Sequence, residues 1–294
     1  MSAIKQIIKF ISQVGLGSSV YKRRVLLSTP EFKELKKYPN ILSWFSLTSV
    51  FSGDYIHDKK INFIYNPQTD IGNLLYKTGQ FEDLEIIFSS QLLESFEAGT
   101  VLDIGANVGV HVISWAKKNE KHFFYAFEPT RAVFGVLSQS IKNNKLSSRV
   151  SAISKAVSNK RGTAQFFETS DDAYNSLKDT QRKNVNFVYD VNVISVDDFV
   201  SENKIEDLRF VKIDTEGFED EVISGASDTI KKFMPDFFIE IYKGVNSNAN
   251  PEATIQKMIS HGYNAYVFKN GKLETYINHN DQIYNYFFSK RLLI

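Results

Sequence analysis

The chain has 294 residues, of which 43% are hydrophobic, and its formal net charge at pH 7 is +1. This share of apolar residues is enough for a packed core and excludes a disordered chain. The small net charge argues against a nucleic-acid partner that binds through bulk electrostatics. The chain contains no cysteine, which excludes disulfides, thiolate nucleophiles and cysteine-ligated zinc.

Residues 1–70 are interpreted as an N-terminal, mainly helical extension, and residues 71–294 as the main domain. Isoleucines recur at helical spacing over residues 3–14, with lysines on the other side. A helix packed on its own domain is the favoured interpretation, and contact with a membrane surface is the alternative. The sequence has no apolar run of about 18 residues and no signal-peptide pattern. We therefore expect no transmembrane segment and a cytoplasmic protein.

Residues 81–92 carry apolar side chains at helical spacing and lead towards an apolar strand that ends at residue 104. Glu82 lies at the start of this helix, where a carboxylate stabilises the helix dipole. In the second interpretation, Glu82 reaches the loop that follows the strand.

The loop after this strand has the pattern D-x-G-x-x-x-G, from Asp103 to Gly109. Gly105 and Gly109 let the backbone turn sharply and approach a ligand, and the first amides of the next helix point into the same space. A second strand, 122–127, ends in Glu128, where a carboxylate suits a bidentate hydrogen bond to a ribose diol. Together these features predict a site for a nucleoside cofactor.

The spacing of the glycines helps to choose the cofactor. A dinucleotide site has G-x-G-x-x-G, which places pyrophosphate on the helix N-terminus, and this chain lacks that pattern. Asp103 precedes the turn, and its carboxylate would repel a phosphate but attract a sulfonium or ammonium group. S-adenosylmethionine has a ribose and a cationic centre and no phosphate, so it is the predicted cofactor.

Strands alternate with helices along the rest of the chain. We expect strands over residues 122–127, 149–153, 162–168, 186–196, 209–213 and 236–241, helices over 110–118, 131–143, 218–233 and 252–261, and a terminal hairpin around residues 270–271. This alternation predicts an α/β fold of the Rossmann-like kind, with a mostly parallel sheet and helices on both faces.

A polar stretch over residues 169–184 interrupts this alternation and has no periodicity. Loops of this length inside a compact domain are usually functional or mobile. We interpret the stretch as a lid or acceptor loop, with Asn175 and Ser176 placed to contact hydroxyl groups of a substrate.

Acidic residues follow the later strands at their carboxyl ends, where ligands bind in such sheets. Asp214 and Glu216 come after strand 209–213, and Glu240 lies near the end of the next strand. Carboxylates that converge raise one another's pKa, and one of them can then act as a general base near neutral pH. These three residues are the candidates for catalysis.

A metal site is the alternative for the acidic run that contains Asp214, Glu216, Glu219, Asp220 and Glu221. Oxygen ligands suit Mg²⁺ or Ca²⁺, but the spacing differs from that of an EF-hand. Acids in the first turn of a helix also stabilise its dipole without any metal. We therefore predict no metal site.

Three motifs of the sequence resemble those of the FkbM-type S-adenosylmethionine-dependent methyltransferases. They are V-L-D-I-G-A-N-V-G at 101–109, A-F-E-P at 126–129 and K-I-D-T-E-G-F-E at 212–219. Weaker matches lie at 79–82, 155–158, 175–177, 196–199 and 235–240. Taken together in this order and spacing, the matches extend over about residues 71–242. Residues 71–294 are accordingly expected to form a methyltransferase domain.

The resemblance implies a class I methyltransferase fold, with a seven-stranded sheet whose last strand is antiparallel. It also implies methyl transfer to a hydroxyl of a sugar, a glycan or a secondary metabolite, so the expected partner is a small-molecule or glycan acceptor. The candidate cofactor-binding residues are Glu82, Asp103, Gly105, Ala106, Asn107, Gly109, Glu128, Pro129 and Ala156. The residues alone leave two alternatives, an NAD(P)-dependent oxidoreductase or epimerase and a non-catalytic binding module.

Overall fold

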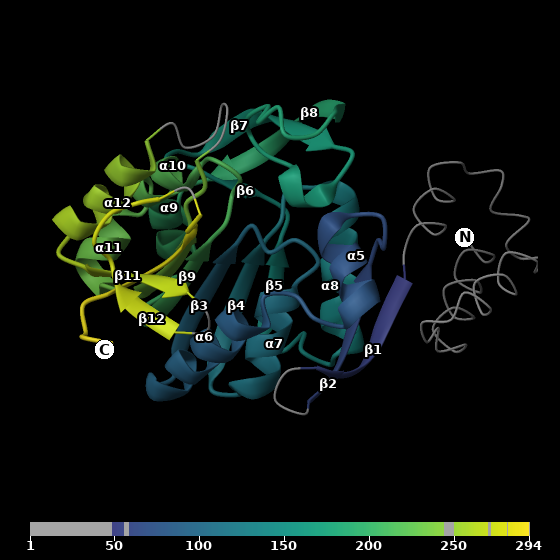
Figure 1. Cartoon of the computed structure of the whole chain (residues 1–294), viewed down its shortest axis with the longest axis horizontal. Coiled ribbons are helices and arrows are strands. Elements are labelled where there is room, and N and C mark those ends of the chain that lie inside the picture. The colour runs from purple at the N-terminus through teal and green to yellow at the C-terminus, as the bar shows by residue number, and fades with distance from the viewer. Residues whose placement is uncertain (1–48, 56–58, 244–249, 270–271, 281, 294) are drawn as a thin grey trace, which may run out of the picture.

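The computed structural model describes residues 49–55, 59–243, 250–269, 272–280 and 282–293 (Figure 1). Within these residues the main sheet has eight strands, in the order β12-β11-β13-β10-β9-β3-β4-β5. In chain order these are β3 (Gly99–Ile104), β4 (His122–Phe127), β5 (Val150–Ile153), β9 (Leu208–Ile213), β10 (Asp236–Glu240), β11 (Asn264–Lys269), β12 (Lys272–Thr275) and β13 (Asn285–Ser289). Strands β5, β4, β3, β9 and β10 are parallel, and β13 lies antiparallel between β10 and β11.

This sheet confirms the predicted mostly parallel architecture with an antiparallel last strand. It has one strand more than the seven predicted, because β11 continues into a hairpin with β12 at the sheet edge. Lys269 pairs with Lys272 at the start of that hairpin, as the turn signal at 270–271 predicts. The two turn residues themselves lie outside the described residues.

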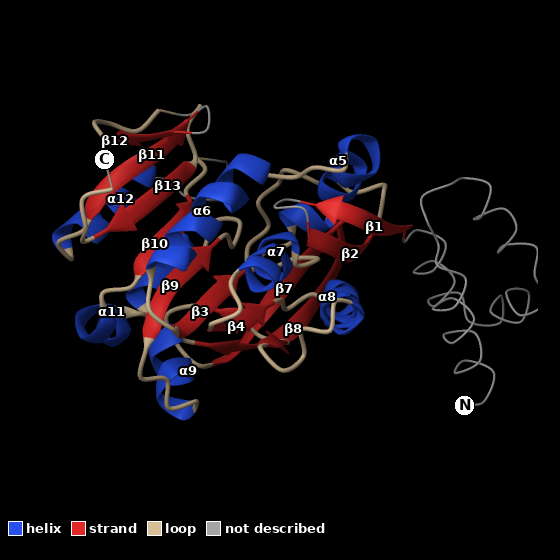
Figure 2. Cartoon of the chain, turned by 90° about the horizontal axis from the view of Figure 1, so that it is seen from below, coloured by secondary structure: helices blue, strands red, loops and turns tan. Residues whose placement is uncertain are grey.

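Helices cover both faces of the sheet, as Figure 2 shows from below. One face carries α5 (Asp70–Thr78), α6 (Asp83–Ser95), α7 (Val110–Lys118) and α8 (Arg131–Asn143), and the other carries α9 (Val196–Glu202), α10 (Glu219–Ser224), α11 (Ser227–Phe233) and α12 (Pro251–Ser260). No helix in the described part of the chain combines the length and the apolar character that crossing a bilayer requires.

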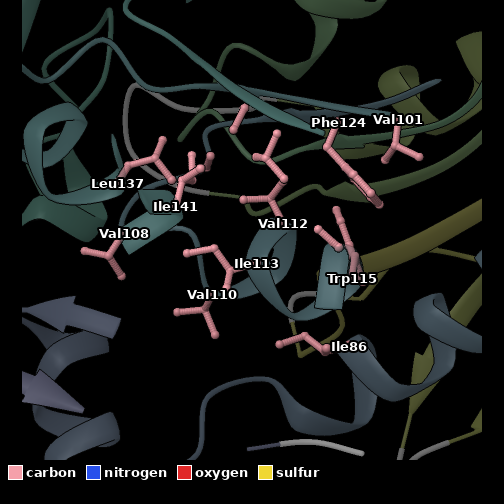
Figure 3. Packing of buried hydrophobic residues seen from close by; sticks show 14 of the residues in the cluster. Ile86, Val101, Val108, Val110, Val112, Ile113, Trp115, Phe124, Leu137 and Ile141 are labelled. Atoms are coloured by element: carbon pink, nitrogen blue, oxygen red, sulfur yellow. The ribbon is translucent and has the colours of Figure 1, made fainter. Parts of the chain in front are cut away.

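Alternation along the central strands divides the core into two layers. On β3, Val101 packs in the layer of α6 to α8, and Leu102 packs in the layer of α9 to α12. Phe210 and Val211 on β9 divide in the same way, since successive strand residues point to opposite faces. Figure 3 shows the first layer, where Trp115 is fully buried among apolar side chains. The buried sheet therefore gives the loops at its carboxyl ends a rigid base.

The helix predicted over residues 218–233 is two helices, α10 and α11, with a break at Gly225. A Cβ atom at Gly225 would lie 2.3 Å from the carbonyl oxygen of Ser158. The close approach of that distant segment explains the break, and a local pattern of apolar residues does not reveal it.

The described part of the N-terminal extension is an antiparallel hairpin of β1 (Ser49–Tyr55) and β2 (Lys59–Tyr65), not a helix. Ile61 and Phe63 of β2 are buried in the same layer as α7 and α8. The hairpin therefore packs on the main domain. The helix predicted over residues 3–14 lies outside the described residues, and the boundary at 70/71 stays a prediction.

A small second sheet, in the order β6-β8-β7, lies beyond the carboxyl ends of β3, β4 and β5 (Figure 1). Its strands are β6 (Ala156–Val157), β7 (Gly162–Thr169) and β8 (Val185–Ile194). The polar stretch between β7 and β8 contains a short 3-10 helix, η1 (Asp172–Tyr174), and Ser176 forms a bridge back to Phe167. The predicted long loop is thus held against its own sheet.

Candidate active site

A cavity of about 400 Å³ opens at the carboxyl ends of the central strands. The predicted site residues that line it are Glu82, Gly105, Asn107, Glu128, Pro129, Ala156, Asn175, Ser176, Asp214, Glu216 and Glu240. Asp103, Ala106 and Gly109 do not line the cavity, although they belong to the same loop. The structure therefore brings most of the sequence candidates to one place.

Two glycines shape the loop after β3. Gly105 has a φ of 82°, and a Cβ atom there would lie 1.7 Å from the carbonyl oxygen of Asp214. Gly109 has a φ of 91° and precedes α7, and a Cβ atom there would lie 2.6 Å from Leu137 Cδ1. Side chains at these positions would be strained and would clash, so glycine allows the loops after β3 and β9 to touch.

The Glu128 carboxylate lies at the end of β4 and is buried. Its Oε2 accepts a hydrogen bond from the backbone N–H of Asn107 at 3.1 Å, and its Oε1 accepts one from Thr130 N–H at 2.7 Å. Burial raises the pKa of Glu128 to about 7 despite these bonds. The Thr130 side chain also bonds to this carboxyl group, and Phe127 and Val157 line the cavity nearby. This corner can hold a flat apolar group beside a pair of hydroxyls.

Asp103 is buried behind the cavity wall, where the Lys212 ammonium lies 3.9 Å from its Oδ1. Burial raises the pKa of Asp103 to about 6, Lys212 opposes this shift, and Asp214 adds to it. Lys212 Nζ also donates a hydrogen bond to Asp214 Oδ2 at 3.0 Å. Burial alone would lower the pKa of Lys212, but the surrounding carboxylates outweigh burial and raise it.

Three carboxyl groups of the cavity wall are buried enough to favour their protonated forms. Burial, with Asp214 adding repulsion, raises the pKa of Glu82 and of Glu216 to about 8 and that of Glu240 well above its usual range. Glu82 Oε2 lies 3.3 Å from His111 Nε2. Burial lowers the pKa of His111 well below its usual value, so this contact joins two neutral groups at pH 7.

Arg182, from the stretch between β7 and β8, binds Glu216 through its guanidinium. The same guanidinium lies over the rings of Tyr174 and Tyr242, 4.3 and 4.6 Å from their centroids. These contacts connect three separate segments across the cavity. The β7–β8 stretch therefore covers part of the cavity.

Glu219 organises the loop between β9 and α10. Its Oε1 accepts hydrogen bonds from Thr215 N–H at 3.0 Å, Thr215 Oγ1 at 2.9 Å and Gly217 N–H at 3.1 Å. Asp220 pairs with Lys257, and Glu221 pairs with Lys178. Across the described ranges, no group of three or more His, Cys, Asp or Glu side chains is arranged to hold a metal ion. The acids after Glu216 thus have structural partners.

Asn175 and Ser176 line the cavity but also bond within the protein. Asn175 Oδ1 accepts from Thr169 N–H at 2.7 Å, and its Nδ2 donates to Thr130 Oγ1 at 3.2 Å. Ser176 Oγ donates to the backbone carbonyl of Glu216 at 2.9 Å. These bonds hold the β7–β8 stretch over the cavity, and contact of both residues with a substrate stays a prediction.

Sequence analysis missed several residues of the site. They are Asp172, Arg182, Tyr242 and Tyr284, which line the cavity, and Lys212 behind it. Lys212 had a readable signal, because a lysine in a buried apolar strand needs a charged partner. The others lie in loops or after strands, where no periodicity indicates which way a side chain points.

Comparison with known proteins identifies the family. The family model described as Methyltransferase FkbM domain matches residues 103–265. A curated relative, the hexuronic acid methyltransferase AglP of Haloferax volcanii, is 28% identical over 156 residues, which are 53% of this chain and 61% of AglP. The chain thus spans about three-fifths of that relative's length.

Solved structures with methyltransferase folds are similar at a lower level. The methyltransferase FkbM of Methylobacillus flagellatus KT has a TM-score of 0.47 and 16% identity, over 74% of this chain and 52% of its own. The METTL16 MTase domain has a TM-score of 0.44 and 12% identity, over 93% of this chain and 98% of its own. Structural similarity at this level says nothing about the residues of the site.

The family match extends from Asp103, before the glycine loop, to Ala265 in β11. It therefore includes most of the parallel sheet and the loops that form the cavity. Membership of a methyltransferase family argues against the oxidoreductase or epimerase alternative. The chain belongs to the FkbM methyltransferase family, and its mostly parallel sheet with helices on both faces is Rossmann-like.

Proposed function

We propose that this enzyme methylates a hydroxyl oxygen of a sugar or glycan. One observation carries the proposal: Glu216 and Glu240 line the same cavity as the partly exposed rings of Tyr242 and Tyr284. The two rings meet edge to face, with centroids 6.5 Å apart. An aromatic ring can cover the apolar face of a pyranose while carboxyl groups bind its hydroxyls. The hexuronic acid methyltransferase relative supports a sugar acceptor.

The cofactor half of the cavity is proposed to lie along the loop after β3 and the end of β4. Glu128 would bind the ribose hydroxyls, because it lines the cavity at the end of β4 and a carboxyl group can accept hydrogen bonds from both hydroxyls of a diol. Gly105, Asn107, Pro129 and Ala156 would form the walls of this half. Ala106 and Gly109 would act through the shape of the loop, since neither lines the cavity.

The acidic half of the cavity suits the positive end of the cofactor. Glu82, Asp214 and Glu240 line it, and Asp103 lies behind them. A cation bound beside these carboxyl groups lowers their pKa and favours their ionised forms, and their oxygens can accept hydrogen bonds from an ammonium. The residues present therefore fit S-adenosylmethionine, which supplies a methyl group already activated by the sulfonium.

The chain would then have to orient the acceptor hydroxyl, exclude water and remove a proton. As the hydroxyl oxygen gains the methyl group, its O–H bond breaks and the proton passes to a carboxylate oxygen. Asp214, Glu216 and Glu240 are the candidate bases. The β7–β8 stretch, held by Arg182 and Ser176, would cover the reacting groups.

A turnover screen tests the proposal. The full chain would be incubated with S-adenosylmethionine and a panel of free sugars, nucleotide sugars and glycolipids, with neutral and uronic acid members in each class. We expect S-adenosylhomocysteine to form with at least one carbohydrate, and the product to carry an O-methyl group by mass spectrometry. Asp214→Asn should lower turnover about 10²–10⁴-fold if Asp214 is the base. Turnover only on amines or nucleic acids would refute the proposal.

A further inference from the structure

Lys212 occupies an unusual position for a lysine. It lies in β9, directly opposite Asp103 of β3 on one side and Phe238 of β10 on the other. Its side chain is only 5% exposed. A buried ammonium is costly unless carboxylates surround it, so its surroundings should explain its presence.

Two carboxylates meet the Lys212 ammonium. Asp214 Oδ2 accepts a hydrogen bond from Nζ at 3.0 Å, and Asp103 Oδ1 lies 3.9 Å away. Asp214 follows Lys212 by two residues. Because side chains alternate along a strand, residues two apart point to the same face of the sheet. The Asp214 side chain is 27% exposed and lines the cavity, whereas Asp103 is buried behind it. Lys212 thus connects a buried carboxylate with one that can meet a substrate.

The other candidate bases lack such a partner or have a different one. Glu216 is bound to Arg182, which holds it against the β7–β8 stretch. Glu240 is partly buried at the end of β10, the strand next to β9, and its raised pKa favours a protonated carboxyl that cannot accept another proton. Asp214 therefore differs from both, because it joins the cavity to a buried cation.

We propose that Lys212 is a positioning residue, whose buried ammonium keeps Asp214 ionised and directed into the cavity, so that Asp214 takes the acceptor proton. This inference rests on the proposed methyl transfer to a hydroxyl. The other titratable groups that face this pair are Asp103 on β3, Glu82 before α6, His111 on α7, Glu216 after β9 and Glu240 on β10. All but the histidine are acids, and Arg182 pairs with one of them, Glu216. Lys212 is the cation in direct contact with Asp214, where it offsets the repulsion from these acids.

The first test needs no acceptor. The full chain, labelled with ¹³C at its aspartate carboxyl carbons, would be titrated by NMR, with Asp214 assigned by its loss in Asp214→Asn. Lys212→Met should move the midpoint of the Asp214 titration upward by more than one pH unit. Lys212→Arg keeps the charge and Lys231→Met removes an exposed lysine of α11, so both should keep the wild-type midpoint. An unchanged midpoint in Lys212→Met would overturn the proposal.

A second titration covers the case in which Lys212→Met does not fold. Asp214→Asn changes a partly exposed loop residue, and the Asp103 signal can be followed in that variant. If Asp214 is ionised, its removal relieves repulsion, and the Asp103 midpoint should move to lower pH. If the Asp103 midpoint does not move, Asp214 carries no charge and the proposal is wrong.

Kinetics then test the positioning role with an acceptor from the turnover screen. Lys212→Met should lower kcat about 10- to 100-fold at pH 7, with kcat recovering at higher pH and KM values changing less. Lys212→Arg should recover most of the activity. A loss of kcat that is equal at every pH would indicate a merely structural role. If the NMR titration behaves as expected but no carbohydrate is methylated, the assignment of the acceptor fails and the charge state of Asp214 stands.

Discussion

The Oε2 atom of Glu128 accepts a hydrogen bond from the backbone N–H of Asn107 at 3.1 Å, which connects the end of β4 to the loop after β3. Asn107 has a φ of 48°, a left-handed conformation that is uncommon for a residue other than glycine. The bond to a buried carboxylate helps to hold it there. One side chain therefore shapes the cofactor loop and, in our proposal, also binds the ribose.

Glu128→Ala should weaken the binding of S-adenosylhomocysteine. Loss of charge-assisted hydrogen bonds to two hydroxyls costs roughly 1.5–3 kcal/mol, which corresponds to about 10- to 150-fold in Kd. Isothermal titration calorimetry on the folded variant would measure this change. Glu120→Ala, which removes an exposed carboxylate before β4, is the control and should bind as the wild type does. Equal affinity of both variants would mean that Glu128 has only the structural role.

Gly105→Ala should destabilise the fold. The new methyl group would meet the carbonyl oxygen of Asp214, and the left-handed backbone adds strain, together costing about 2 kcal/mol or more. Gly135→Ala is the matched control, because Gly135 lies exposed in α8 and a Cβ atom there has nothing within 4 Å. That change should stabilise the chain by about 0.5–1 kcal/mol. Urea unfolding of both variants checks the opposite signs.

The stability of the ligand-free chain should fall as pH rises from about 5 to above 8. The pKa of Glu82 is raised to about 8 from an ordinary 4.5, so over this range the folded state keeps a proton that the unfolded state has released. The stabilising contribution of the protonated group is therefore full at low pH and is lost through pH 8. Glu128 and Glu216 add to the same trend, since burial raises their pKa as well.

Glu82→Gln tests the sign of this effect. The amide resembles the protonated carboxyl and cannot ionise, so the variant should gain stability relative to the wild type as pH rises from 5 to 8.5. Urea unfolding at several pH values measures the difference. Glu97→Gln changes a side chain that is 91% exposed and should show no such trend. A constant difference between Glu82→Gln and the wild type would contradict the pKa direction.

Chelation tests the prediction that no metal is required. Treatment with EDTA should leave S-adenosylhomocysteine binding, the melting temperature and turnover unchanged, because Glu219 already bonds to its own loop and Asp220 pairs with Lys257. Turnover that disappears with EDTA and returns with Mg²⁺ would make the acidic run a metal site.

Elements with a strong periodic pattern could be predicted from the sequence almost to the residue. The expected helices at 110–118 and 131–143 coincide with α7 and α8, and the expected strand at 122–127 coincides with β4. In each case one face of the element packs against the sheet or the core, and the apolar residues recur at the spacing of that buried face. The break at Gly225 depends on the distant segment at Ser158, which no local pattern contains.

Some residues of the site could likewise be predicted from the sequence, and others could not. Asp103, Glu128 and Asp214 lie at or next to the carboxyl ends of apolar strands, so their convergence at one edge of the sheet could be predicted from strand ends alone. Arg182 could not, because it lies in an aperiodic stretch and meets Glu216 only when the small sheet folds over the cavity. The structure also shows that Ser176, expected to contact a substrate, donates its hydrogen bond to the carbonyl of Glu216.

The place of β13 has a consequence for how this enzyme emerges from the ribosome. β13 is the last strand of the main sheet in chain order, yet it lies between β10 and β11. Until β13 is synthesised, the edge of β10 has open N–H and C=O groups, and β11 has no partner on that side. A nascent chain therefore passes through a stage in which its central sheet is unfinished and prone to pair with other chains.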